Sequence, residues 1–276
     1  MTFDNAFWSS ISGYLSIGCW LIVFTPQLWE NYTRKSGDGL SMTFLVIWLL
    51  GDVFNLVGVV MQDLLFTMLL LAVWYTLADI GLIWQVLYYQ NTSSSRKRSE
   101  DSRETDPLLP RNILDEPTRR KRNQIIPIAT LVISTIALIG SMAYYVFTHM
   151  DSDDSSHADK DKKQFQIIPQ IMGWTSAVLY IASRVPQIVK NYKDQSTEGL
   201  SLAMFFCAVM GNVFFTLSIF LRSVDPTYLL INLSWIIGSC GTLVFDFTIF
   251  MQFIIYKQPP TSTSHANLSG GDDNHF

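Results

Sequence analysis

Long apolar runs separated by short polar segments dominate the chain up to about residue 256. No charged residue occurs between Asp4 and Glu30, and a later run is free of acidic residues, lysine and arginine from Asn123 to Met150. A helix needs about 20 mostly apolar residues to cross a bilayer, so each run predicts a membrane-spanning helix. Seven spans are expected, at Ile11–Trp29, Ser41–Met61, Leu64–Tyr89, Gln124–Phe147, Ile168–Tyr192, Leu200–Leu221 and Tyr228–Tyr256.

The composition supports this interpretation. Of the 276 residues, 49% are hydrophobic and 15% are charged, whereas soluble domains carry about 25% charged residues. This composition excludes a disordered protein and argues against an ordinary soluble enzyme. The net charge of −4 gives no reason to expect nucleic-acid binding. We therefore expect an all-α integral membrane protein.

Positive charges divide unequally between the two ends of the predicted spans. Fourteen basic residues lie in segments at one end and four at the other. Because cytosolic loops carry the excess of Lys and Arg, the N-terminus is predicted to be lumenal and the C-terminus cytosolic. The expected segments are a lumenal N-terminus (1–10), a first three-helix unit (11–89), a disordered cytosolic linker (90–123), a linker helix (124–148), a lumenal loop (149–167), a second three-helix unit (168–257) and a cytosolic tail (258–276).

An internal repeat relates the two three-helix units. A shift of 160 residues aligns thirteen identical residues within 42 positions without a gap. The first members of these pairs are Gly13, Ser16, Pro26, Gln27, Asn31, Tyr32, Ser36, Gly39, Leu40, Ser41, Gly51, Val53 and Phe54. Trp74 and Trp235 extend the match weakly, at a shift of 161.

The repeat predicts a 3+1+3 arrangement of seven helices. Because the linker helix reverses the chain once, both units enter the membrane in the same direction. Parallel repeats of this kind occur in transporters, which bind substrate near the midplane between the repeats. Duplication for stability alone is the plain alternative.

The duplicated Pro26-Gln27 and Pro186-Gln187, each followed by Asn-Tyr and then Gly-Leu-Ser, resemble the signature of the PQ-loop repeat family. With a Gly-Asp or Gly-Asn pair in each second helix, the chain is most similar to the vacuolar and lysosomal cationic amino acid transporters. Relatives that carry cystine or sugars share this fold. The resemblance implies proton-coupled export of Arg, Lys and His to the cytosol, with amino acid and protons as small-molecule partners and membrane lipid around the helices.

Ionisable groups inside predicted spans are candidate functional residues, because burying them is costly. They are Asp52, Asp79, Arg184 and Asp246. Asp52 and Asn212 occupy equivalent repeat positions, so they could face one another across a central cavity that suits a cationic or zwitterionic substrate. Asn55 is one helical turn from Asp52 and joins this candidate site.

The roles of these groups stay open at this point. Asp52 could couple proton release to transport, since burial disfavours a charged carboxylate, or it could be a hydrogen-bonded structural acid. Asp79 could pair with Arg184 as a gate or as a structural ion pair. Asp246 has no partner that the sequence identifies.

Proline inside a helix removes a backbone hydrogen bond and produces a kink. Pro26 and Pro186 therefore predict hinges that let each unit rock, and the amides of Gln27 and Gln187 could bind the freed carbonyl groups. A static kink is the alternative. The Gly-Leu-Ser segments are predicted to be tight turns in which serine caps the next helix.

Four aromatic residues in the predicted spans could line a cavity and stack on a cationic side chain. They are Trp74, Tyr75, Tyr180 and Trp235. Packing or interface anchoring is the common alternative for aromatic residues in membrane helices.

Glu104, Leu108 and Leu109 fit an acidic dileucine sorting signal within the predicted cytosolic linker. In that context the motif predicts delivery to the vacuole or lysosome through a sorting adaptor.

No catalytic residues, metal ligands or cofactor sites are predicted. The three cysteines lack metal-ligand spacing, the four histidines lie outside the spans or at their edge, and no phosphate loop occurs. An enzyme is therefore not expected. The alternative to a transporter is a seven-helix nutrient receptor that signals through cytosolic partners, although a parallel repeat argues against a G-protein-coupled receptor fold.

Overall fold

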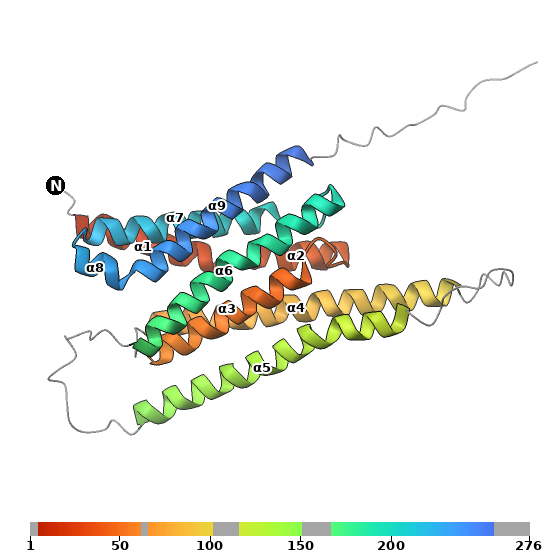
Figure 1. The fold of residues 1–276 in the computed structure, drawn as a ribbon, viewed down its shortest axis with the longest axis horizontal. Helices are drawn as coiled ribbons and strands as arrows, with labels where there is room; N and C mark the ends of the chain where they lie inside the picture. Colours follow the sequence, from red (N-terminus) through yellow and green to blue (C-terminus); the bar gives the residue numbers. More distant parts are fainter. Residues whose placement is uncertain (1–4, 62–65, 102–115, 151–166, 257–276) are drawn as a thin grey trace, which may run out of the picture.

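The computed structural model describes residues 5–61, 66–101, 116–150 and 167–256, and within these ranges all regular structure is α-helical. The helices are α1 (Asn5–Ile22), α2 (Thr25–Arg34), α3 (Met42–Met61), α4 (Phe66–Asp101), α5 (Glu116–Met150), α6 (Ile167–Asp194), α7 (Leu202–Arg222), α8 (Pro226–Ile231) and α9 (Leu233–Ile255). They lie alongside one another in an elongated bundle (Figure 1). The all-α prediction is confirmed.

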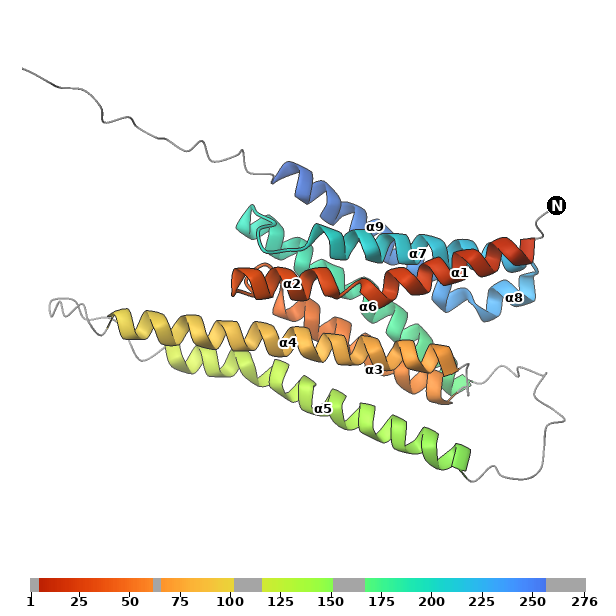
Figure 2. The ribbon, with the colours of Figure 1, turned by 180° about the vertical axis from the view of Figure 1, so that it is seen from behind.

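The two three-helix units run in the same direction along this bundle (Figure 1). The first unit comprises α1 with α2, then α3 and α4, and the second comprises α6, α7, and α8 with α9. α5 lies between the units in sequence and packs on the outside of the bundle against α3 and α4 (Figure 2).

The units interlock instead of packing as two separate bundles. The first helix of each unit packs on the second helix of the other, α1 against α7 and α6 against α3. Glycine permits both close approaches. A Cβ atom at Gly51 would lie 2.8 Å from the Tyr180 ring, and one at Gly211 would lie 2.8 Å from the Trp20 ring. Because 51 and 211, like 20 and 180, differ by 160, the two contacts are repeat equivalents.

Six stretches of helix within the described residues are long and apolar enough to cross a membrane. They are Asn5–Arg34, Met42–Met61, Met68–Thr92, Gln124–Thr148, Leu202–Arg222 and Leu233–Ile255. α6 is not among them, since it carries Arg184 and several polar residues. Its position between α3 and α9 lets it bury those polar groups inside the bundle. The seven-span topology remains a prediction that depends on α6.

Two helices extend into the segment predicted to be a disordered linker. α4 continues to Asp101, and α5 begins at Glu116. Helix extension beyond an apolar span costs little where Arg, Lys and Glu, which are good helix formers, follow it. The sorting motif at Glu104, Leu108 and Leu109 lies outside the described residues.

The two Pro-Gln motifs differ in their helical setting. α1 ends at Ile22, α2 begins at Thr25, and Pro26 therefore stands in the first turn of a new helix, where its missing N–H costs nothing. The expectation that Pro26 lies inside a continuous helix is thus wrong. Pro186 does lie inside α6. The first unit has a chain break where the second has an intact proline-containing helix.

The third helices of the two units follow a different shift from the first two. The Gln85 side chain donates to the Leu28 carbonyl at 3.1 Å, and the Gln252 side chain donates to the Ile188 carbonyl at 2.9 Å. Leu28 and Ile188 are 160 residues apart, whereas the two glutamines are 167 apart. The extra residues enter between α7 and α9, where the second unit has the short helix α8.

The shift of 167 between the third helices shows that the proposed extension of the repeat through Trp74 and Trp235 is wrong. A shift of 167 pairs Trp74 with Gly241 and Trp235 with Met68. The weak match at 161 is therefore coincidental, since it ignores the added residues between α7 and α9.

The two Gly-Leu-Ser turns meet back to back where the units cross. A Cβ atom at Gly39 would overlap the backbone carbonyl of Gly199, and Gly199 itself has a φ of +77°. Backbone atoms cannot move aside as a flexible side chain can. Both positions therefore require glycine.

We expect Gly39→Ala to destabilise the protein by about 1–3 kcal/mol, because the added methyl group overpacks a backbone contact. Thermal unfolding of the detergent-purified protein measures the effect. Gly140→Ala is the matched control, since a Cβ atom there meets no atom within 4 Å. Equal melting temperatures for the two variants would contradict the predicted back-to-back contact.

Candidate functional site

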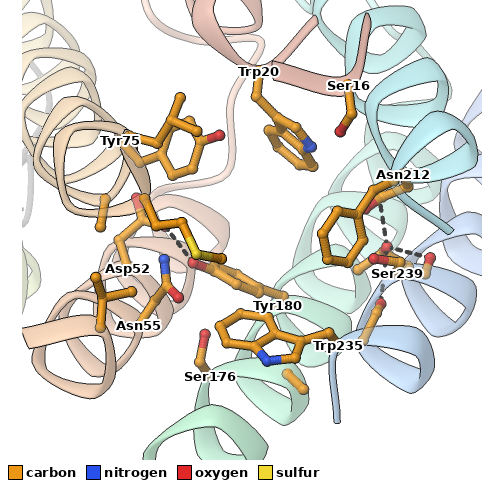
Figure 3. A pocket seen from close by; sticks show the side chains of 18 of the residues that line it. Ser16, Trp20, Asp52, Asn55, Tyr75, Ser176, Tyr180, Asn212, Trp235 and Ser239 are labelled. Atoms are coloured by element: carbon orange, nitrogen blue, oxygen red, sulfur yellow. Dashed lines mark hydrogen bonds between the residues drawn. The ribbon is translucent and has the colours of Figure 1, made fainter. Parts of the chain in front are cut away.

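A cavity of about 280 Å³ lies between the two units. Figure 3 shows side chains from both units converging on it. Its polar lining includes Ser16, Asp52, Asn55, Ser176, Tyr180, Arg184, Asn212, Ser234, Ser239 and Thr242. Its aromatic lining includes Trp20, Phe24, Trp48, Tyr75, Phe215 and Trp235.

Asp52 is the buried acid of this cavity, at 1% exposure in the middle of α3. The Tyr180 hydroxyl donates to its Oδ1 atom at 2.7 Å, and this bond joins the two units (Figure 3). Its Oδ2 atom accepts no hydrogen bond within the described residues. Asp52 is therefore bound to the second unit through one of its two carboxyl oxygens.

Asp79 of α4 lies within hydrogen-bonding reach of Asp52. It is 0% exposed, and neither of its carboxyl oxygens accepts a hydrogen bond from a described residue. It does not line the cavity. A second carboxyl group thus stands directly behind the first.

Asn212 faces the cavity from the side opposite Asp52, as the repeat predicts (Figure 3). Its amide donates to the Thr242 hydroxyl at 3.0 Å. Asn55 also lines the cavity, and its Oδ1 atom has no hydrogen-bond partner among the described residues. Two amides and a carboxyl group therefore project into one space.

Three of the four predicted cavity aromatics, Tyr75, Tyr180 and Trp235, line the cavity. Trp74 does not, because its side chain is 39% exposed and its indole N–H donates to the Leu21 carbonyl. Trp20 also lines the cavity, although it is not among the aromatic residues predicted from the sequence. Its repeat equivalence to Tyr180, through the shift of 160, was the signal that could have found it.

Of the partners that the sequence left open for Arg184, the structure pairs it with Asp246 and not with Asp79. Nε of Arg184 donates to Asp246 at 3.2 Å, and both residues are almost fully buried. Because the third helices follow a shift of 167, Asp246 is the equivalent of Asp79. The equivalent of Arg184 is Phe24, so the first unit has the acid without the cation.

The two Pro-Gln glutamines bind the opposite unit, not the carbonyl groups of their own helices. Nε2 of Gln27 donates to the Gly199 carbonyl at 2.9 Å, and its Oε1 accepts from the Ser201 N–H at 2.7 Å. Gln187 makes the same pair of bonds to Gly39 and Ser41, at 3.0 and 2.7 Å. We call these two sets of bonds the glutamine clasps.

Each glutamine clasp is supported by a chain of amide hydrogen bonds within its own unit, buried except at the half-buried Gln85. Gln27 donates to Asn31 at 2.8 Å, and Asn31 donates to Gln85 at 3.0 Å. In the second unit Gln187 donates to Asn191 at 2.8 Å, and Asn191 donates to Gln252 at 2.8 Å. In the sequence, the two asparagines stand out only as an identical pair in the repeat. No sequence pattern predicts the roles of Gln85 and Gln252.

The serine caps that the sequence predicts are present. The Ser41 hydroxyl accepts from Phe44 N–H and the Ser201 hydroxyl from Met204 N–H, both at 3.3 Å. An ion pair between Arg34 and Glu198 also joins the units at this end.

An apolar cluster lies between the cavity and the clasps. Phe24 and Trp48 belong both to this cluster and to the cavity lining, while Leu40 and Leu200 extend it into the Gly-Leu-Ser turns. Phe44 and Phe205 pack within it, with ring centroids 6.3 Å apart. The cavity is therefore closed toward the Pro-Gln end of the bundle.

Within the described residues, no group of three His, Cys, Asp or Glu side chains could hold a metal ion. Cys19, Cys207 and Cys240 are free thiols. The chemistry of the cavity lies in its carboxyl, amide, hydroxyl and guanidinium groups.

Two repeated units of helices enclose a cavity between them, an arrangement that is found among membrane transporters. A model of the PQ loop repeat matches residues 8–68 and 168–228. Since full-length relatives also match, the chain belongs to the PQ-loop repeat family, and the resemblance seen in the sequence is confirmed.

The relatives are named as amino acid transporters. The vacuolar lysine transporter YPQ1 of Saccharomyces cerevisiae is 38% identical, over 91% of this chain and 94% of its own length. The vacuolar histidine transporter YPQ3 of the same yeast is 36% identical, over 91% and 93%. The human lysosomal amino acid transporter 1 homolog is 29% identical, over 93% and 84%. All three of these relatives are named as transporters, and none is named as an enzyme.

Proposed function

We propose that this protein transports cationic amino acids across a vacuolar or lysosomal membrane. The observation that carries the proposal is that Asp52 lines the cavity between the units, with Asp79 buried beside it, and that neither acid forms an ion pair with a described residue. Arg184, the one basic side chain lining the cavity within the described residues, is already paired with Asp246. A cationic substrate would supply the missing positive charge.

The size and lining of the cavity support a small amphipathic substrate. Its volume of about 280 Å³ is near the lower end of the roughly 300–1,000 Å³ typical of small-molecule sites. Tyr75, Tyr180 and Trp235 offer aromatic faces, which attract cationic groups. Lysine, arginine and histidine combine an aliphatic or aromatic stem with a group that carries positive charge.

We further propose that Asp52 and Asp79 carry the coupled proton. Two neighbouring carboxyl groups buried in a low-dielectric site repel each other when both are charged, so they favour sharing one proton. One shared proton leaves the pair with a single negative charge, which a cationic substrate beside Asp52 would balance. Substrate and proton would then move through linked steps, from an acidic lumen to the cytosol.

Alternating access would open the Pro-Gln end, which the basic residues predict to be cytosolic. The apolar cluster and glutamine clasps close that end in this structure. The helix break before Pro26 and the proline inside α6 are candidate hinges. The described state is then the one that loads from the lumen.

The receptor alternative is not favoured, because the relatives are named as transporters and the units surround a cavity. The dileucine motif supports the vacuolar or lysosomal location, although Glu104, Leu108 and Leu109 lie outside the described residues.

Uptake into proteoliposomes tests the function. We expect saturable uptake of labelled lysine, arginine and histidine that increases when the substrate side is acidic, and little uptake of cystine. Protein-free liposomes and an excess of unlabelled alanine are the controls. Uptake of cystine alone, or of none of the four, would contradict the proposal.

A further inference from the structure

Arg184 combines near-complete burial with access to the cavity. The residue is 1% exposed, yet it is part of the cavity lining. Its Nε atom donates to Asp246 at 3.2 Å, and its Nη1 atom donates to the Tyr180 carbonyl at 3.2 Å and the Ser183 hydroxyl at 2.9 Å. Its guanidinium lies 4.6 Å from the centroid of the Trp48 ring. The group is therefore fixed in position before any ligand binds.

One nitrogen of this guanidinium is unused. Arginine has five N–H donors, and two of them belong to Nη2. Nη2 makes no hydrogen bond to any described residue. Nη2 is also not one of the fully buried atoms without a partner, and Arg184 lines the cavity, so its donors are available to an anion that enters there.

The position of the cation is also asymmetric. Its repeat equivalent is Phe24, and the acid equivalent to Asp246 is Asp79, which forms no ion pair with any described residue. If the bundle required a cation beside each of these acids, the first unit would need one too. Only the second unit has such a cation, Arg184, and that cation lies next to the cavity.

The cavity lining contains one basic side chain and one acidic side chain, which match the carboxylate and the ammonium group on the α-carbon of an amino acid. Arg184 stacks beside Trp48, and Asp52 lies one helical turn farther along α3. Since both side chains line the same cavity, one substrate can present its carboxylate to Arg184 and its ammonium group to Asp52.

We propose that Arg184 binds the α-carboxylate of the transported amino acid and so makes the carrier reject amines that lack it. This inference rests on the proposed function and adds a selectivity that cationic charge alone does not provide. Charge-assisted bonds from guanidinium to carboxylate are among the stronger polar contacts in proteins. Their loss predicts a tenfold to hundredfold difference in affinity, on the order of the usual range for such bonds.

Binding to the detergent-purified full-length protein tests the inference. Displacement of labelled arginine by unlabelled arginine is compared with displacement by agmatine, which keeps the guanidinium but lacks the carboxylate. Wild type is expected to prefer arginine by about tenfold or more. Arg184→Gln should weaken arginine binding to the level of agmatine while leaving agmatine unchanged. Arg222→Gln, at an exposed site at the end of α7, should keep the wild-type preference.

The double variant Arg184→Gln/Asp246→Asn separates ligand binding from charge balance. It removes the cation together with its buried partner, so no unpaired acid remains at Asp246. We expect it to stay as unselective as the single variant. Recovered preference for arginine would overturn the inference, since Arg184 would then serve only to neutralise Asp246. Equal wild-type affinity for arginine and agmatine would also overturn it, whereas absence of binding by both would instead refute the proposed function.

Discussion

Replacing Asp52 by Asn is expected to lower proton-driven lysine uptake by about tenfold to hundredfold, the loss typical of one charge-assisted contact. Asn keeps the size of the side chain and can still accept from the Tyr180 hydroxyl. It has neither the negative charge that binds a cation nor a group that takes up a proton. The residual uptake should therefore no longer respond to the pH gradient. Initial rates in proteoliposomes, with and without an acidic substrate side, measure both effects.

Asp38→Asn is the matched control for this change. It makes the same chemical substitution at an exposed residue in the turn before α3, outside the central cavity. We expect wild-type uptake and gradient dependence from it. If Asp52→Asn, folded and reconstituted to the same level, retained gradient-dependent uptake at the wild-type rate, Asp52 would not carry the proposed role.

Breaking both glutamine clasps is expected to have the second large effect. In Gln27→Leu/Gln187→Leu, the buried N–H groups of Ser201 and Ser41 lose their acceptors. An orphaned buried donor costs about 1–3 kcal/mol, so two should lower the melting temperature by at least several degrees. The Pro-Gln end should then open more often. A cysteine introduced at Leu200, a buried member of the apolar cluster, should react faster with a water-soluble maleimide.

The experiment uses a background in which the three native cysteines are replaced. Gln170→Leu, a half-buried glutamine near the start of α6, is the matched control and should leave labelling unchanged. The two single variants should give similar effects, because the clasps are repeat equivalents. Unchanged melting and labelling in the double variant would show that the clasps do not hold this end closed.

The 160-residue repeat predicted much of this arrangement. It placed Asp52 opposite Asn212 and marked the Pro-Gln and Gly-Leu-Ser segments as equivalent. An identity pattern does not say which unit a side chain bonds to, however. Gln27 was expected to bind a carbonyl of its own helix, but the interlocked packing brings the Gly199 turn to it instead. Which residue of the other unit a side chain bonds to depends on tertiary packing, and the repeat in the sequence carries no information about that packing.

The third helices show a second limit. The residues added between α7 and α9 change the shift from 160 to 167, and a gap-free comparison loses the match there. The equivalence of Asp79 and Asp246 was hidden for this reason. So was the partner of Asp246, because Arg184 occupies the place of Phe24 and no identity marks that position.

The exchange of clasps between units also sets an order for biosynthesis. Gln27 and its carbonyl partner Gly199 are 172 residues apart in the chain, and Gln187 and Gly39 are 148 apart. The Gln187–Gly39 bond can therefore form only once α6 has been synthesised, and the Gln27–Gly199 bond only once the turn between α6 and α7 has followed. Until then the side-chain amide of Gln27 must form hydrogen bonds with water or with other groups at the membrane surface. The first unit is therefore synthesised without either clasp; α6 brings the first clasp through Gln187, and the Gly199 turn then completes the second with Gln27.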